Sequence, residues 1–185
     1  MKVAVAFDHR GVRLRERLFA ELTALGHEAV DLGTDKPEPR IDYPDKAREV
    51  GEALRAGEAE RAVLVCGSGV GASVAANKLA GVRAAVCHDT YSAHQGVEHD
   101  DMNVLCLGSE VIGAELGAEL VRAFLGARFD GGEPYVRRLE KIEEMEGEKM
   151  PTNQSDDSDR VDRSFQTDAR AEPARPDVGA AESAP

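Results

Sequence analysis

Short apolar segments alternate with longer amphipathic ones over the first 146 residues, and this alternation constrains the fold more than any other feature of the chain. The short segments are each about five residues long and rich in Val, Ala or Leu; they are residues 2–7, 28–32, 62–66, 83–87 and 104–107. Apolar and polar residues do not alternate in them, as they would in a strand with one solvent-exposed face. They are therefore typical of parallel strands that are covered on both sides.

The longer segments have helical spacing. A leucine stripe over residues 14–25 ends at Gly26, and further stripes follow over residues 44–54, 116–125 and 136–142. Alternating strands and helices predict right-handed crossovers. We therefore expect an α/β, Rossmann-like three-layer fold, in which a five-stranded parallel sheet carries helices on both faces. Its ligand site should lie at the carboxyl ends of the strands.

The C-terminal part of the chain has a different composition. Residues 151–185 hold 8 Asp and Glu, 4 Arg and 4 of the 8 prolines, but no Leu, Ile, Met, Tyr or Cys. Such a segment buries too little apolar surface to offset the entropy lost on ordering. We predict one domain over residues 1–148 and a disordered acidic tail over residues 149–185; a tail that folds on binding a partner is the alternative.

Charge and cysteine content exclude several classes of protein. The net charge of −12 argues against a nucleic-acid binder, although a few local donors can still bind a small anion. No apolar run approaches the roughly 18–20 residues of a membrane span, and the N-terminal apolar stretch is too short for a signal peptide. Three widely spaced cysteines do not indicate a disulfide framework. We expect a soluble protein of the reducing cytoplasm, with no membrane or nucleic-acid partner.

A glycine-rich loop follows the third strand, in the order Cys66-Gly67-Ser68-Gly69-Val70-Gly71. Alternate glycines between a strand and a helix let several backbone amides face a ligand, which suits a phosphate or an enolate oxygen. A tight turn with a purely structural role is the plainer interpretation. The loop also fits the weak dinucleotide pattern G-x-G-x-x-A with Asp89 downstream, but that pattern normally follows the first strand.

Cys66 comes directly before this loop. Unpaired amides and the positive end of a helix stabilise a thiolate, so Cys66 is a candidate base or nucleophile. The alternative is a small buried apolar side chain, which is how we interpret Cys106 and Cys87.

The histidines suggest a shared site. His9 follows Asp8 at the end of the first strand, where it can touch a ligand. His88, His94 and His99 match no strong zinc pattern, so we predict no metal site. His99 precedes the fifth strand and should lie at the sheet edge opposite Cys66, because a five-residue strand spans roughly 16 Å. If both residues serve one reaction, a second subunit must supply His99, which predicts a two-fold dimer.

Seven segments resemble ribose-5-phosphate isomerase type B, a family that includes galactose-6-phosphate isomerase. They are Asp8-His9-x-Gly11, Asp42-Tyr43-Pro44, Cys66 to Gly71, Ala75-Ala76-Asn77-Lys78, Tyr91-Ser92-Ala93, His99-x-x-x-Asn103-Val104-Leu105 and Phe129-Asp130-Gly131-Gly132. The resemblance covers residues 1 to about 145, in order. It implies an aldose–ketose isomerase of ribose 5-phosphate and ribulose 5-phosphate that uses no metal or organic cofactor. It also implies a homodimer with shared active sites, or a tetramer of such dimers.

The resemblance assigns roles to individual residues. The residue matching Cys66 moves a proton between C1 and C2 through an enediolate, and the residue matching His99 opens the furanose ring. A second branch of the family instead uses a glutamate at the position of Ala75, so this chain resembles the cysteine branch. The remaining implied substrate-binding residues are Asp8, His9, Tyr43, Gly67, Ser68, Gly69, Val70, Gly71, Asp100 and Arg137.

Four positions depart from the family pattern. Ser68 replaces a threonine and Asp100 an asparagine, while Glu110 and Glu133 stand where arginines commonly bind phosphate. Arg10, next to His9, is a candidate substitute. The alternatives in function are therefore an isomerase of another sugar phosphate, such as allose 6-phosphate or a tetrose phosphate, or a non-catalytic binder of nucleotides or sugar phosphates.

Overall fold

A computed structural model describes residues 1–147 of the protein. Its strands are β1 (Lys2–Phe7), β2 (Glu28–Asp31), β3 (Arg61–Cys66), β4 (Ala84–Val86) and β5 (Val104–Gly108). They form one parallel sheet in the order β2-β1-β3-β5-β4. Each predicted strand agrees with the observed one to within one residue at either end. The predicted tail over residues 149–185 lies outside the described residues.

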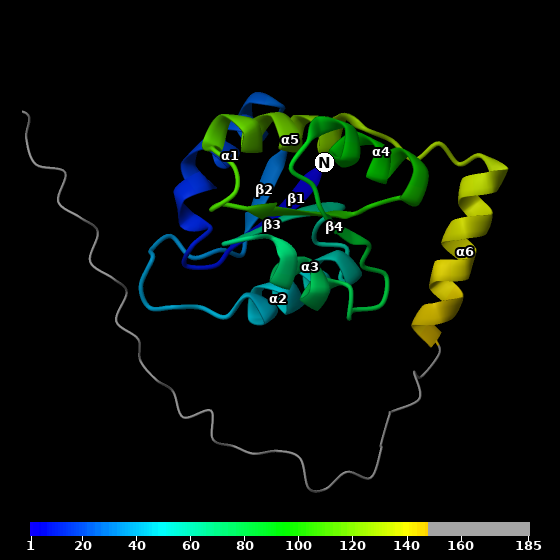
Figure 1. The fold of residues 1–185 in the computed structure, drawn as a ribbon, viewed down its shortest axis with the longest axis horizontal. Coiled ribbons are helices and arrows are strands. Elements are labelled where there is room, and N and C mark those ends of the chain that lie inside the picture. The colour runs from blue at the N-terminus through cyan, green and yellow to red at the C-terminus, as the bar shows by residue number, and fades with distance from the viewer. Residues whose placement is uncertain (148–185) are drawn as a thin grey trace, which may run out of the picture. The chain divides into compact units, whose positions relative to one another are not determined.

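Helices cover both faces of the sheet, which confirms the predicted three-layer fold (Figure 1). On one face lie α1 (Val12–Ala24), α4 (Thr90–Asp100) and α5 (Ala114–Gly126); on the other lie α2 (Tyr43–Arg55) and α3 (Val70–Ala76). Strand side chains alternate between the two cores. In β1, Val3, Val5 and Phe7 pack toward the first group of helices, while the alanines between them pack toward the second.

Helix α4 is the element that the sequence pattern did not predict. Its buried side chains are Ala93 and Val97 only, which is too narrow a stripe to stand out from the sequence. Local signals define its ends instead. The Asp89 carboxylate accepts a hydrogen bond of 2.7 Å from the Ser92 amide at its start, and Asp101 ends it in the left-handed conformation at φ 48°.

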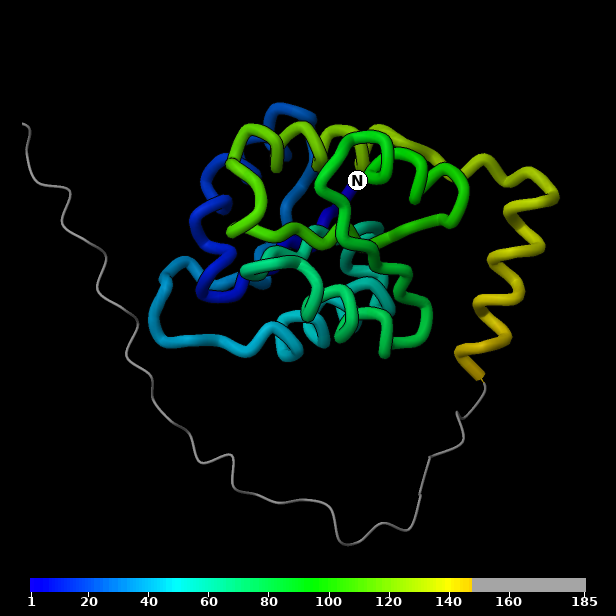
Figure 2. The backbone as a smooth tube through the Cα atoms, viewed as in Figure 1, coloured from blue at the N-terminus to red at the C-terminus, as the bar shows by residue number. Residues whose placement is uncertain are grey.

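Helix α6 (Glu133–Gly147) runs along the edge of the molecule, beside α4 (Figure 2). None of its residues is buried. Two contacts hold it. The Tyr135 ring stacks on the His99 ring with 4.3 Å between centroids, and the Glu146 carboxylate accepts a hydrogen bond of 2.9 Å from the Gly81 amide. The helix continues to Gly147, through Glu143, Glu144 and Glu146, beyond its last predicted apolar residue.

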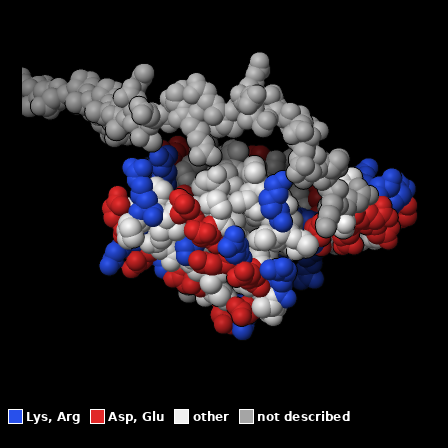
Figure 3. All heavy atoms as spheres, turned by 90° about the horizontal axis from the view of Figure 1, so that it is seen from below, with Lys and Arg blue, Asp and Glu red and all other residues white. Residues whose placement is uncertain are grey.

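Charge is mixed on the surface. On the face shown in Figure 3, basic side chains lie among acidic ones rather than in one continuous field, and α6 at the right carries both signs. Within residues 1–147, no helix combines the length and the apolar character needed to span a membrane.

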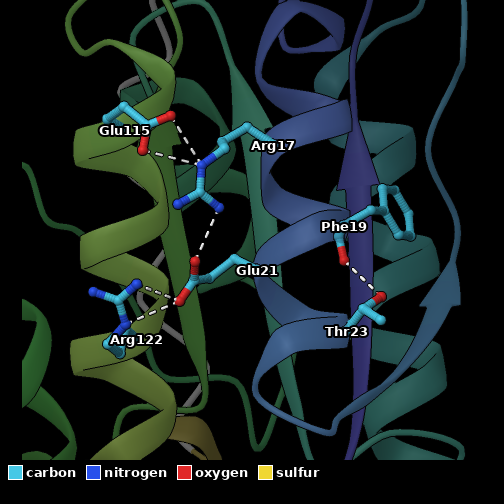
Figure 4. Close-up of polar contacts among 6 residues, drawn as sticks. All are labelled: Arg17, Phe19, Glu21, Thr23, Glu115 and Arg122. Atoms are coloured by element: carbon cyan, nitrogen blue, oxygen red, sulfur yellow. Dashed lines mark hydrogen bonds and ion pairs between the residues drawn. The ribbon is translucent and has the colours of Figure 1, made fainter.

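A buried carboxylate joins α1 to α5 (Figure 4). The Glu21 side chain is 5% exposed and accepts hydrogen bonds of 2.9 Å from both Arg17 and Arg122. Arg17 also reaches Glu115 on α5 at 3.0 Å. Burial alone would raise the pKa of Glu21, but the hydrogen bonds from Arg17 and Arg122 outweigh it, so the pKa lies below its ordinary value.

We predict that Glu21→Gln lowers the free energy of unfolding by about 1–3 kcal/mol, because a neutral amide makes weaker hydrogen bonds to the two arginines. Urea unfolding at pH 7 measures the loss. Because the pKa of Glu21 is lowered from 4.5, its contribution is complete above pH 4.5 and disappears as the pH falls through the folded-state value. The difference between the two proteins should therefore shrink in acid.

The matched control is Glu115→Gln. The Glu115 side chain is 79% exposed, so its pairing with Arg17 should contribute less than about 1 kcal/mol. Equal destabilisation by the two variants would contradict the role assigned to Glu21.

Candidate active site

The topology of the sheet opens a crevice between β1 and β3. The two strands are neighbours, but the chain leaves β1 toward α1 on one face and leaves β3 toward α3 on the other. Loops that diverge at a switch point leave room for a ligand at the carboxyl ends of the strands. Phe7 pairs with Val65, and the Asp8 amide donates to the Val65 carbonyl at 3.0 Å. The residues after β1 therefore come opposite Cys66.

The cleft at this crevice has a volume of about 340 Å³. Its lining comes from the turn after β1, the loop before α2 and the glycine loop after β3. The predicted site residues that line it are Asp8, His9, Tyr43, Cys66, Gly67, Ser68 and Gly71. A cavity thus lies at the carboxyl ends of the strands, where the sequence predicts a ligand.

Cys66 ends β3 and lies on the floor of the cleft. Its side chain is only 3% exposed in the single chain, yet it lines the cavity. The Gly69 amide donates to the Cys66 Sγ atom at 3.1 Å. The sulfur therefore faces both a main-chain amide and the cavity.

The glycine loop requires its glycines at two positions. Gly69 has φ 81°, a conformation that side chains rarely adopt, and it aims its amide at the sulfur. A β-carbon at Gly71 would lie 2.6 Å from Cζ of Tyr43, so the Tyr43 ring needs a glycine beneath it. Within residues 1–147, the amides of Gly67 and Ser68 donate no hydrogen bond. They are available to a ligand oxygen, whereas α3 is only seven residues long and adds a short dipole.

The other two cysteines lie in a different environment. Burial, together with the nearby Asp89 carboxylate, raises the pKa of Cys87 to about 11. Burial also raises the pKa of Cys106, whose side chain has no exposed surface. Both therefore stay neutral thiols near pH 7, in agreement with their interpretation as packed apolar side chains.

The turn after β1 forms one wall of the cleft. Asp8 is 4% exposed, and its Oδ1 atom accepts hydrogen bonds of 2.8 Å from the amides of Arg10 and Gly11. The His9 Nδ1 atom lies 3.2 Å from the carbonyl oxygen of Ile41. This contact fixes the imidazole against the loop before α2 and leaves its Nε2 atom for a ligand.

Three predicted residues lie in a second group, away from this cleft. His99 and Asp100 are in the last turn of α4, which precedes β5 at the amino-terminal edge of the sheet, whereas Cys66 is at the carboxyl-terminal edge. The Gln95 side-chain nitrogen lies 2.6 Å from the His99 Nδ1 atom. Arg137, in α6, donates to the Glu133 carboxylate at 2.8 Å. The expectation that Cys66 and His99 of one chain lie at opposite edges agrees with this arrangement.

Sequence reasoning missed several residues of both groups. Arg40 and Ile41 line the cleft, but no signal marks them apart from their place before Asp42-Tyr43-Pro44. Gln95 stands four residues before His99, so a prediction of α4 would have found it. Tyr135 comes from a separate helix, and no pattern in the sequence pairs it with His99.

A larger cavity of about 400 Å³ lies between α6 and the sheet edge, with Asp100, Met102 and Met145 in its wall. Its lining is mostly apolar and contains none of the residues around Cys66, so the smaller cleft is the candidate active site. Among residues 1–147, no cluster of three or more His, Cys, Asp or Glu side chains is arranged to hold a metal ion.

Known proteins with similar sequences and structures agree with this architecture. The model of the family described as Ribose/Galactose Isomerase matches residues 3–142. The chain is 45% identical over 145 residues to ribose-5-phosphate isomerase B of Escherichia coli, covering 78% of this chain and 96% of that protein. It is 35% identical over 148 residues to D-erythrulose-4-phosphate isomerase of Pectobacterium atrosepticum, covering 79% of this chain and 97% of that protein.

Among solved structures, ribose-5-phosphate isomerase B of Clostridium thermocellum superposes with a TM-score of 0.76 at 42% identity, covering 79% of this chain and 97% of that chain. The fold, the order of the motifs and the match to the family model all agree. The chain belongs to the ribose/galactose isomerase family.

Proposed function

We propose that the protein interconverts ribose 5-phosphate and ribulose 5-phosphate, with Cys66 as the group that moves the proton. The observation that carries the proposal is the Cys66 sulfur on the floor of the cleft, 3.1 Å from the Gly69 amide and beside two unused amides. Membership of the ribose/galactose isomerase family and the name of the Escherichia coli relative support the same substrate.

The reaction follows from this geometry. The Cys66 thiolate removes the proton from C2 of the open-chain aldose, and the electron pair moves through the C1–C2 bond to give an enediolate. The amides of Gly67 and Ser68 hold the developing negative oxygen, each such donor typically contributing about 3 kcal/mol to the barrier reduction. The thiol then returns the proton to C1, while the hydroxyl proton of O2 passes to O1. The product is the ketose.

Ring opening is assigned to His99 of a second subunit. One chain holds the Cys66 and His99 sites at opposite edges of its sheet, so a homodimer with shared active sites brings them together. Exposed apolar side chains beside the glycine loop support such a contact: Val70 is 56% exposed and Val74 58% exposed. A tetramer of two such dimers is compatible with the same site.

The remaining residues bind the substrate in this proposal. The subunit that provides Cys66 also provides a first set of substrate-binding residues: Asp8, His9, Tyr43, Ser68 and the loop from Gly69 to Gly71. Asp100 and Arg137 act from the subunit that provides His99. No metal or organic cofactor takes part. The cytoplasm is the proposed location, a compartment in which Cys66, Cys87 and Cys106 would keep the unpaired state that they have here.

A tetrose phosphate is the second candidate substrate, because the name of the Pectobacterium relative is that of an erythrulose-phosphate isomerase. The candidate substrates differ in the number of carbon atoms, so a kinetic comparison distinguishes them. We expect kcat/KM to be highest for ribose 5-phosphate when it is compared with allose 6-phosphate and erythrose 4-phosphate. A preference for either of the others would replace the proposed substrate and leave the chemistry intact.

We predict that Cys66→Ala lowers kcat for ribose 5-phosphate by about 10²–10⁴-fold, because it removes the group that moves the proton in this proposal. The assay follows ribulose 5-phosphate formation with EDTA present. Binding of substrate, measured by calorimetry, should change little. The control is Cys87→Ala, which removes a thiol outside the cleft; comparable losses from both variants would argue against the role of Cys66.

We predict that two inactive variants complement each other when their subunits are mixed. A heterodimer of Cys66→Ala and His99→Asn contains one site with both residues intact. Random reassociation should then restore about a quarter of the wild-type activity on ribose 5-phosphate. Mixing under conditions that allow subunit exchange, with each variant alone as control, measures the recovery. Sites built within single chains would give no recovery.

A further inference from the structure

We propose that Arg10 and Arg40 bind the phosphate group of the substrate in this chain. The inference rests on the proposed function, because it names the phosphate-binding side chains of the same cleft. Arg137, which the family resemblance implies as a substrate-binding residue, belongs to the subunit that provides His99 in the proposed homodimer. Arg10 and Arg40 are cations of the subunit that provides Cys66.

Arg10 reaches over the glycine loop. A β-carbon at Gly67 would lie 2.9 Å from the Arg10 Cδ atom and 3.4 Å from its Nη1 atom. The backbone beneath the side chain is held, since the Ser109 hydroxyl donates to the Arg10 carbonyl at 2.9 Å and the Arg10 amide donates to Asp8. The guanidinium therefore lies next to Gly67, and Arg10 is part of the lining of the cleft.

Arg40 lies in another part of the lining, in the loop before α2. It precedes Ile41, whose backbone contacts the His9 ring, so Arg40, His9 and Arg10 all border one cavity. Two guanidinium groups and an imidazole suit an oxyanion with several acceptor atoms.

Neither arginine is neutralised by the protein. In the part of the chain that the structure describes, no carboxylate oxygen lies within 4.0 Å of either guanidinium. Both arginines are exposed residues, and what they share is that they border the same cavity. Two carboxylates also border the cleft. Asp8 is engaged by the amides of Arg10 and Gly11, while Asp42 is exposed at the start of α2.

The two glutamates that replace family arginines are paired elsewhere. Glu110 lies 4.0 Å from Arg13, and Glu133 lies 2.8 Å from Arg137. The second pair also occupies the guanidinium of Arg137. The Glu110 Cγ atom would be 3.7 Å from the same β-carbon at Gly67 that Arg10 approaches. The side chains of Arg10 and Glu110 thus both lie next to Gly67. In this chain the positive charge there comes from Arg10, whereas the family pattern has an arginine at position 110.

The test measures binding of inorganic phosphate by calorimetry and the kinetics of ribose 5-phosphate. Arg10→Gln and Arg40→Gln should each weaken phosphate binding by about 10–100-fold, as expected for a lost hydrogen bond to a charged group. KM should rise more than kcat falls. The control is Arg48→Gln on the exposed surface of α2, outside the cleft, which should leave both quantities unchanged.

A charge-swap variant distinguishes binding from a structural role. Adding Glu110→Arg to Arg10→Gln returns a cation to the same spot and should recover at least about tenfold of the lost affinity. Unchanged phosphate binding in Arg10→Gln, or no recovery in the double variant, overturns the proposal. If the wild type binds phosphate through these arginines but does not isomerise ribose 5-phosphate, the proposed function fails and this assignment stands.

Discussion

The neighbouring positions of β1 and β3 are the constraint on which the rest of the site depends. Because the chain turns toward opposite faces of the sheet after these two strands, their carboxyl ends stay uncovered. The buried valines and alanines of both strands fix that adjacency. A cleft bordered by the turn after β1 and the glycine loop after β3 is the direct consequence, and the sulfur of Cys66 lies at its floor.

The chain divides its candidate chemistry between two places. Cys66 and the amides of the glycine loop lie at one edge of the sheet, and the imidazole of His99 lies at the other, in contact with Gln95 and Tyr135. The proposed homodimer would bring the two places together by two-fold symmetry. Helix α6 has no buried residue, and its Tyr135 ring stacks on the His99 ring, so this helix contacts a candidate site residue.

Much of this architecture could be predicted from the sequence, for identifiable reasons. Doubly covered strands leave continuous apolar runs, and the glycine loop follows one of them, so the fold and the position of Cys66 were accessible. Helix α4 was not, because it buries only Ala93 and Val97. Contacts between distant segments, such as Tyr135 with His99 or Arg10 with Gly67, depend on side-chain packing that no spacing encodes.

The partner of the Cys66 sulfur is a main-chain amide, and this has an evolutionary consequence. Every amino acid except proline offers that N–H group, but the donor is Gly69, whose φ of 81° side chains rarely adopt, so a substitution there acts on the bond through the shape of the loop. Only a change in loop shape can remove it, and the left-handed backbone at Gly69 is where such a change would begin. The environment of the thiol is thus set by the conformation of the main chain rather than by the identity of a neighbouring side chain.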